Sequence, residues 1–212
     1  SNQLQALNLP TAKEVDCSYN QLQALNLPAA EEVHCYSNPL IIIDTMIKKN
    51  ATIVCDLNQI NRKEYNTIKN DYKIEIGILD KKNSFYKFPS NDEAFDFQDG
   101  KMDLYEIMKY PNLEIRRAML EQQGFGEILQ KCTLEHFSDV GKLWSTNYFS
   151  SFSGEEPLMK LYQCWCTTTN REYLIRVRPD ITTVEEAKIS TWPELWNEYK
   201  KTGIMPEFIY ET

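Results

Sequence analysis

The stretch NQLQALNLP at residues 2–10 returns as NQLQALNLP at residues 20–28, 18 positions further along the chain. Fainter copies of the same stretch begin at Asn38 and Asn58. Self-similarity at a fixed period is the sequence signature of stacked structural units. The repeat therefore predicts how roughly the first 60 residues are built.

The repeats share the frame aliphatic-x-Cys-x-x-Asn-x-aliphatic, which occupies residues 14–22, 32–40 and 52–60. Residues two apart on a strand face the same side. We therefore expect each cysteine, and the aliphatic residue two before it, to point into a core. The asparagine can bond neighbouring backbone groups and end the strand. The cysteines of the frame are Cys17, Cys35 and Cys55, and the residues expected to face outward are Asp16, His34 and Val54.

This frame resembles the leucine-rich repeat family over about residues 1–60, although 18 residues is shorter than the usual repeat of about 20–29. The resemblance implies a solenoid of parallel strands, and the short period favours extended turns rather than helices between them. The third copy is degraded, because Ile41-Ile42-Ile43 replaces its leucine pattern. We expect this segment to be the C-terminal end of a longer array, with repeats before residue 1 and a capping helix over about 60–69. The aliphatic residues expected to point back to the core are Leu4, Leu22, Leu40 and Ile60.

The outward positions of the strands form the candidate binding face. In leucine-rich repeat proteins the concave face often binds other proteins, so the resemblance implies a protein partner here. The alternative is a solvated acidic face without a partner. The candidate residues are Glu14, Asp16, Glu32, His34 and Thr52.

Residues 71–212 have a different pattern, which predicts an α+β domain with helices and an antiparallel sheet. Alternation predicts strands over 73–79, 143–148, 159–167 and 173–178, the last two joined at a hairpin tip near Asn170. Helices are expected over 103–109, 112–121, 125–132 and 183–189, from their caps and apolar stripes. We therefore expect two domains, 1–70 and 71–212. Trp192 and Trp196 are expected to close the chain against the core.

Residues from about 88 to 212 are similar to a bacterial domain family of unknown function that is found behind repeat segments. The similarity is carried by NLEIRRAMLE at 112–121 with Gly124, by GKLW at 141–144, and by YLIRVRPD at 173–180. The segment 145–159 departs from the family pattern. The resemblance implies no activity.

Four arginines are the strongest candidates for chemistry in this domain. Arginine offers bidentate donors to phosphate and carboxylate groups. Such residues could build an anion site, with Glu121 or Asp180 completing an acid–base pair. The alternative is that they form ordinary ion pairs with nearby acids. The four are Arg116, Arg117, Arg176 and Arg178.

A zinc site was weighed for four residues of ligand type. Cys132 and His136 are one helical turn apart if that segment is helical, and Cys164 and Cys166 face the same side of a strand. The spacing lacks the two-residue gap of structural zinc sites. We therefore expect neither a metal nor a cofactor, and the chain has no glycine-rich phosphate loop.

Composition narrows the function classes. The chain has 212 residues, 42% of them hydrophobic, and a net charge of −8. This balance argues against nucleic acid as the partner, and no apolar run is long enough to span a membrane. We expect a cytoplasmic, non-catalytic protein that binds another protein through its repeats. The alternative is an enzyme or anion-binding module in the C-terminal domain, with the repeats as a targeting arm.

Overall fold

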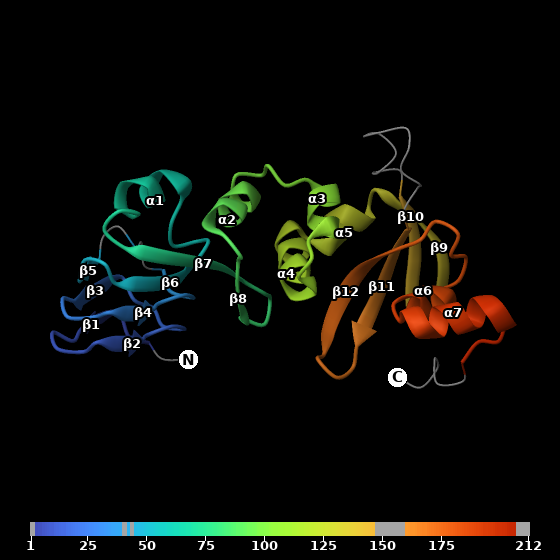
Figure 1. The fold of residues 1–212 in the computed structure, drawn as a ribbon, viewed down its shortest axis with the longest axis horizontal. Coiled ribbons are helices and arrows are strands. Elements are labelled where there is room, and N and C mark those ends of the chain that lie inside the picture. Colours follow the sequence, from blue (N-terminus) through green and yellow to red (C-terminus); the bar gives the residue numbers. More distant parts are fainter. Residues whose placement is uncertain (1–2, 40–41, 43–44, 147–159, 207–212) are drawn as a thin grey trace. The chain divides into compact units, whose positions relative to one another are not determined.

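The computed structural model describes residues 3–39, 42, 45–146 and 160–206 (Figure 1). The chain divides into two compact units, residues 1–103 with 110–122 and residues 104–109 with 123–212. These units divide the chain at a different place from the boundary expected near residue 70. The reason is that strand β7 (Lys73–Leu79) continues the sheet that the repeats begin, and pairs in parallel with β6 (Thr52–Asp56).

The first unit holds two sheets built from the repeats. Equivalent residues of successive repeats pair in parallel, as in Val15↔Val33↔Ile53 and Leu7↔Leu25. One sheet has the order β1-β3-β5, and the other has the order β2-β4-β6-β7-β8, in which only β8 is antiparallel. The strands not yet bounded are β1 (Ala6–Asn8), β2 (Glu14–Asp16), β3 (Ala24–Leu27), β4 (Glu32–His34), β5 (Met46–Ile47) and β8 (Phe85–Lys87).

The repeat cysteines are buried, as predicted, and each of the first two makes a bond to the next strand. The thiol of Cys17 donates to the carbonyl of His34 at 3.3 Å, and that of Cys35 donates to Val54 at 3.6 Å. Cysteine suits these positions because it is small, apolar and a weak donor. Leu22 and Ile60 also lie in the core.

The asparagine of the frame behaves as expected in the second repeat. The amide of Asn38 donates to the carbonyls of Cys17 and Cys35, at 3.1 and 2.8 Å, and its oxygen accepts from Leu22 N at 3.0 Å. In the third repeat the prediction was wrong, because Asn58 is exposed and Gln59 takes this place. Gln59 donates to the carbonyl of Cys35 at 2.8 Å.

Two further positions of the repeat frame need comment. Leu4 was expected in the core, but it is 41% exposed, because it lies next to β1, the outer strand of its sheet. Ile42 is buried, whereas Leu40, Ile41 and Ile43 lie outside the described residues.

The helix predicted over about 60–69 is confirmed as α1 (Arg62–Ile68), which connects β6 to the next parallel strand of the sheet, β7. Helix α1 begins with a capping box between Asn61 and Glu64 and buries Ile68. Helix α2 (Asn91–Gln98) was not predicted, although Ser90 caps it. Helix α4 (Leu113–Gln123) was predicted, with Asn112 accepting from two backbone N–H groups of its first turn.

Arg117 of α4 is a buried cation that holds α4 to the turn after β7. Its side chain is 1% exposed. It donates to Asp80 at 2.8 Å, to Glu114 at 2.8 Å and to Glu121 at 2.6 Å. Asp80 also accepts from the backbone N–H groups of Lys82 and Ser84, at 2.8 Å each. The donors around Asp80 lower the pKa of this carboxyl group against the effect of its burial.

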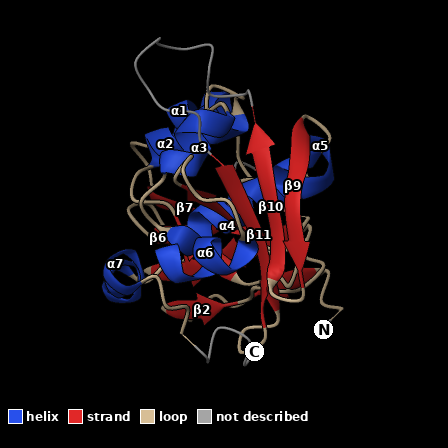
Figure 2. Cartoon of the chain, turned by 90° about the vertical axis from the view of Figure 1, so that its right-hand side faces the viewer, coloured by secondary structure: helices blue, strands red, loops and turns tan. Residues whose placement is uncertain are grey.

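The second unit is an antiparallel sheet with the order β12-β11-β10-β9, of which Figure 2 labels β11, β10 and β9. Its core packs this sheet against helices α6 (Val184–Ser190) and α7 (Pro193–Thr202). The capping box of Thr183 and Glu186 is confirmed. The other elements are α3 (Leu104–Lys109), α5 (Phe125–Leu129), β9 (Cys132–Ser138), β10 (Gly141–Thr146), β11 (Lys160–Cys166) and β12 (Arg171–Val177).

Some expectations for this unit were wrong. The helix expected over 125–132 ends at Leu129, and Cys132 already begins a strand. Trp196 lies in the core at 8% exposure, but Trp192 is 46% exposed because it precedes the first turn of α7. The helix α7 itself was not predicted. In all, the chain is mixed α+β, with seven helices in its described part.

Replacing Arg117 by alanine should destabilise the first unit strongly, because Asp80 would be left buried without its cation. Removing one partner of a buried ion pair costs about 3–5 kcal/mol. All four tryptophans lie in the second unit, so tryptophan fluorescence does not report on the first. The measurement is therefore amide hydrogen exchange of β7 and β8.

The matched control is Arg62→Ala in the same unit. The side chain of Arg62 is 31% exposed and pairs with the surface carboxylates of Asp96 and Asp99. Such pairs contribute about 1 kcal/mol or less. Equal exchange rates in the two variants would contradict the structural role assigned to Arg117.

Candidate interaction face

The predicted binding residues lie on one side of the sheet β2-β4-β6-β7, in two rows across the strands. The first row pairs Glu14↔Glu32↔Thr52, and the second pairs Asp16↔His34. The structure thus brings all five predicted residues together. We call this set, Glu14, Asp16, Glu32, His34 and Thr52, the acidic face.

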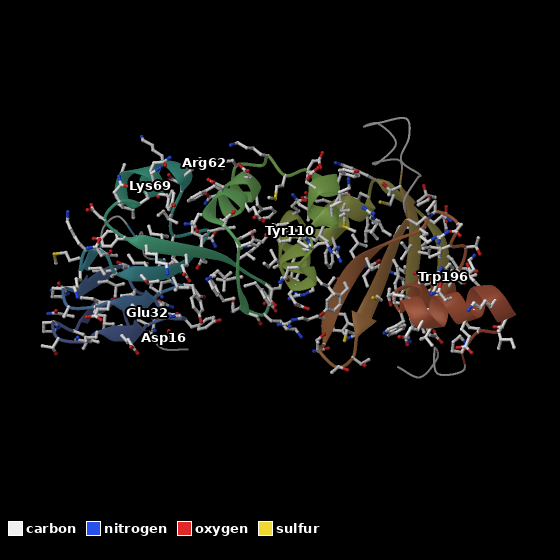
Figure 3. The ribbon with its side chains drawn as sticks, viewed as in Figure 1. Asp16, Glu32, Arg62, Lys69, Tyr110 and Trp196 are labelled. Atoms are coloured by element: carbon white, nitrogen blue, oxygen red, sulfur yellow. The ribbon has the colours of Figure 1, made fainter. Side chains whose placement is uncertain are left out.

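The acidic face is charged and exposed where the first two repeats contribute to it. Glu14, Asp16 and Glu32 are exposed on the neighbouring strands β2 and β4, and Figure 3 labels Asp16 and Glu32 there. His34 bonds Glu32 through Nε2 at 2.8 Å. A groove of about 270 Å³ lies among these side chains. No lysine or arginine of the described residues pairs with Glu14 or Asp16.

The charge on the sheet changes towards β7. There Glu75 pairs with Lys87 at 2.9 Å and Lys73 at 3.7 Å, and these cations lower its pKa. Negative charge is therefore paired with lysines at one end of the sheet, whereas at the other end Glu14 and Asp16 have no lysine or arginine partner in the part of the chain that the structure describes.

Val54 faces the same side of the sheet as His34, as expected, but it is buried there, at only 5% exposure. It lies in register between His34 and Glu75. Side chains on both neighbouring strands therefore cover it, whereas Asp16 lies on an edge strand.

An aromatic cluster, consisting of Tyr19, Tyr36 and Phe85, borders the acidic face. Tyr36 stacks on Phe85 with ring centroids 4.2 Å apart, and Tyr19 meets Tyr36 edge-on at 5.2 Å. The ring of Tyr36 also lies 6.5 Å from that of His34, which places the cluster beside the charged residues. Tyr19 is 38% exposed, so part of the cluster faces solvent.

Gly77 makes room for the aromatic cluster. A Cβ at this position would lie 2.2 Å from the ring of Phe85, closer than atoms can approach. Any side chain on Gly77 would displace that ring. Sequence reasoning missed the cluster, although tyrosine at positions one or two after the repeat cysteine, as in Tyr19 and Tyr36, was a signal for it.

The predicted anion site is not assembled within either unit. Arg116 and Arg117 belong to the first unit, whereas Arg176 and Arg178 belong to the second. Arg117 is enclosed by three carboxylates, as described above. Arg178 pairs with Asp180 at 2.9 and 3.1 Å. Arg176 is exposed on β12.

The four residues weighed as zinc ligands are spread over the second unit. Cys132 and His136 lie on strand β9, where four residues span about 13 Å rather than one helical turn. Cys164 and Cys166 lie on β11, and β10 separates the two strands. His136 accepts from Val184 N at 3.2 Å. No group of three or more potential ligands is gathered for a metal anywhere in the described residues.

All six cysteines are free thiols, with contrasting environments. Burial, assisted by the charge of Asp16, raises the pKa of Cys17 to about 11. Burial raises the pKa of Cys35 and Cys55 still more. Hydrogen bonds from Thr169 and Thr168 lower the pKa of Cys166, which lies at the end of β11. The repeat thiols are therefore expected to react more slowly than Cys166.

Comparisons of this chain with models of protein families, with curated proteins and with solved structures give no match. No helix in the described part of the chain has the length and apolarity that crossing a membrane requires.

Alkylation should distinguish Cys166 from the buried repeat cysteines, since the thiolate is the reactive species. At pH 8, iodoacetamide is expected to modify Cys166 first and to leave Cys35 and Cys55 unmodified while the protein is folded. Peptide mass spectrometry over a time course measures this order. In denaturant all six thiols should react alike, and early modification of Cys35 in the folded chain would contradict its burial.

Proposed function

We propose that this chain is a non-catalytic binding protein whose first unit is a leucine-rich-repeat-type module, and that the acidic face with its aromatic cluster binds a basic segment of another protein. The observation that supports this most is the pair Glu14↔Glu32, in register on neighbouring strands and without a lysine or arginine partner among the described residues.

Like charges directly opposite each other on neighbouring strands destabilise a sheet. The chain neutralises Glu75 on the same sheet with two lysines, yet leaves Glu14 and Asp16 open. A partner that supplies lysine or arginine would relieve this repulsion. Complementary charge of this kind contributes mainly to specificity and to the rate of association.

The aromatic cluster adds a second element of recognition. Tyrosine is enriched at the centres of protein interfaces, because it combines a large apolar surface with a polar end. Cations are also attracted to the faces of aromatic rings. Tyr19 and Tyr36 therefore suit the same basic partner as the carboxylates beside them.

Reversing the charge of the acidic face should weaken binding to basic peptides. The probe is a phage-displayed library of random peptides selected on the whole chain, from which we expect peptides rich in lysine and arginine. In the triple variant Glu14→Lys, Asp16→Lys, Glu32→Lys, the affinity for the selected peptides should fall at least about tenfold, which corresponds to roughly 1.4 kcal/mol. Binding is measured by biolayer interferometry at two salt concentrations, because screening should weaken it.

The matched control is Glu127→Lys, Glu194→Lys, Glu198→Lys, which makes the same change in net charge at exposed positions of the second unit. The control should keep most of the affinity. The proposal fails if both triple variants lose binding equally, since the effect would then come from net charge alone, or if neither loses it.

A further inference from the structure

The second unit contains a pocket at one end of its sheet, apart from the elements that form the acidic face. It lies where the turn between β9 and β10 meets the end of the β11–β12 hairpin, and has a volume of about 310 Å³. Ligand pockets in proteins start at about 300 Å³. The lining side chains used below are Phe137, Lys142, Gln163, Trp165 and Glu172.

Two exposed aromatic rings line this pocket. Phe137 is 64% exposed and Trp165 is 56% exposed, among the highest exposures of large apolar side chains in the described residues. Phe137 on β9 and Gln163 on β11 lie opposite Lys142 in the strand register, one on each side of it. Trp165 is two residues beyond Gln163 and faces the same side of β11. The two aromatic residues therefore flank Lys142 and Gln163. Exposed aromatic surface surrounded by polar groups is typical of a binding site.

Two polar groups of the lining, Gln163 and Glu172, are fixed by hydrogen bonds. Trp144 Nε1 donates to Gln163 Oε1 at 3.0 Å, and Gln163 Nε2 donates to Glu172 Oε1 at 2.5 Å. These two hydrogen bonds set the orientation of the Gln163 amide and of the Glu172 carboxylate. Lys142 makes no ion pair with a carboxylate of the described residues, so its ammonium group can donate to a ligand.

Gly141 allows the backbone of β10 to approach that of β11 closely beside the pocket. Its φ is +146°, and a Cβ there would lie 2.4 Å from the carbonyl oxygen of Gln163. Strand β10 therefore approaches β11 closely at this point, which places Lys142 and Gln163 side by side.

We propose that this pocket binds a pyranose ring of a glycan. A pyranose has apolar C–H faces that can lie against the rings of Phe137 and Trp165. Its rim of hydroxyl groups can both donate and accept. Lys142 supplies donors and Glu172 supplies an acceptor, so the lining serves both roles.

Other ligand classes fit this lining less well. A nucleic acid would need several cations for its phosphates, whereas the pocket contains Lys142 with the acids Asp139 and Glu172. A fatty acyl chain would leave these charged groups without partners, which is costly. A neutral ligand that carries many hydroxyl groups satisfies the rings and the charges together.

The test uses the whole chain on an array of immobilised bacterial, plant and animal saccharides. We expect binding to a defined set of glycans, followed by a change in tryptophan fluorescence when the soluble form of a positive glycan is titrated. Trp165→Ala and Phe137→Ala should each raise the dissociation constant tenfold or more. Trp192→Ala removes an exposed tryptophan elsewhere in the same unit and should leave it unchanged.

Circular dichroism confirms that the variants are folded. The proposal is overturned if no saccharide binds the wild-type chain, if the pocket variants bind as well as wild type, or if Trp192→Ala weakens binding as much as they do. The triple variant of the acidic face should keep full affinity for glycans. Failure of one proposal is therefore distinguishable from failure of the other.

Discussion

The first unit depends on one interaction, the bonding of buried backbone carbonyls between successive repeats. The carbonyl of Cys17 accepts from the amides of Asn20 and Asn38, and that of Cys35 accepts from Asn38 and Gln59. A buried carbonyl without a partner costs about as much as a lost hydrogen bond. Asn38 and Gln59 therefore each tie their own turn to the turn before it, and this holds the parallel strands in register.

That register also creates the acidic face. The side chains of a strand alternate between its two sides, so a slip of one residue would bury Asp16 and expose Val15 and Cys17. The hydrogen bonds from the side-chain amides and the burial of the cysteines prevent such a slip. The same constraint that stabilises the core therefore sets Glu14 opposite Glu32 on the neighbouring strand.

The sequence predicted what local patterns determine. The strand of residues 73–79, the cap at Thr183 and the burial of the repeat cysteines depend on neighbours in the chain, and the structure confirms them. Gln59 in place of Asn58 was not predictable in this way. The asparagine follows the cysteine by three residues in all three copies, so the frame does not distinguish Asn58 from Asn38, yet it is Gln59 that reaches the carbonyl of Cys35.

Other features depend on residues that are distant in the sequence. Arg117 has acids three before and four after it, as a surface arginine would, and only the turn at Asp80, 37 residues away, makes it a buried cation. The spacing of Cys132 and His136 fits a helix as well as a strand, and pairing with β10 decides for the strand. Helix α7 begins at Pro193, a known start signal, but a single proline between polar residues was too weak to predict it.

The two proposed sites differ in how well water solvates their exposed side chains. On the acidic face, carboxylates remain solvated, and solvation alone can maintain them without a partner. In the second unit, Phe137 and Trp165 expose apolar rings that water does not favour, although the core beside helices α6 and α7 buries Tyr162 and Trp196. Apolar surface left exposed does not contribute the stabilisation that burial would give. The pocket of the second unit is therefore the place where a ligand explains more of the structure than solvent does.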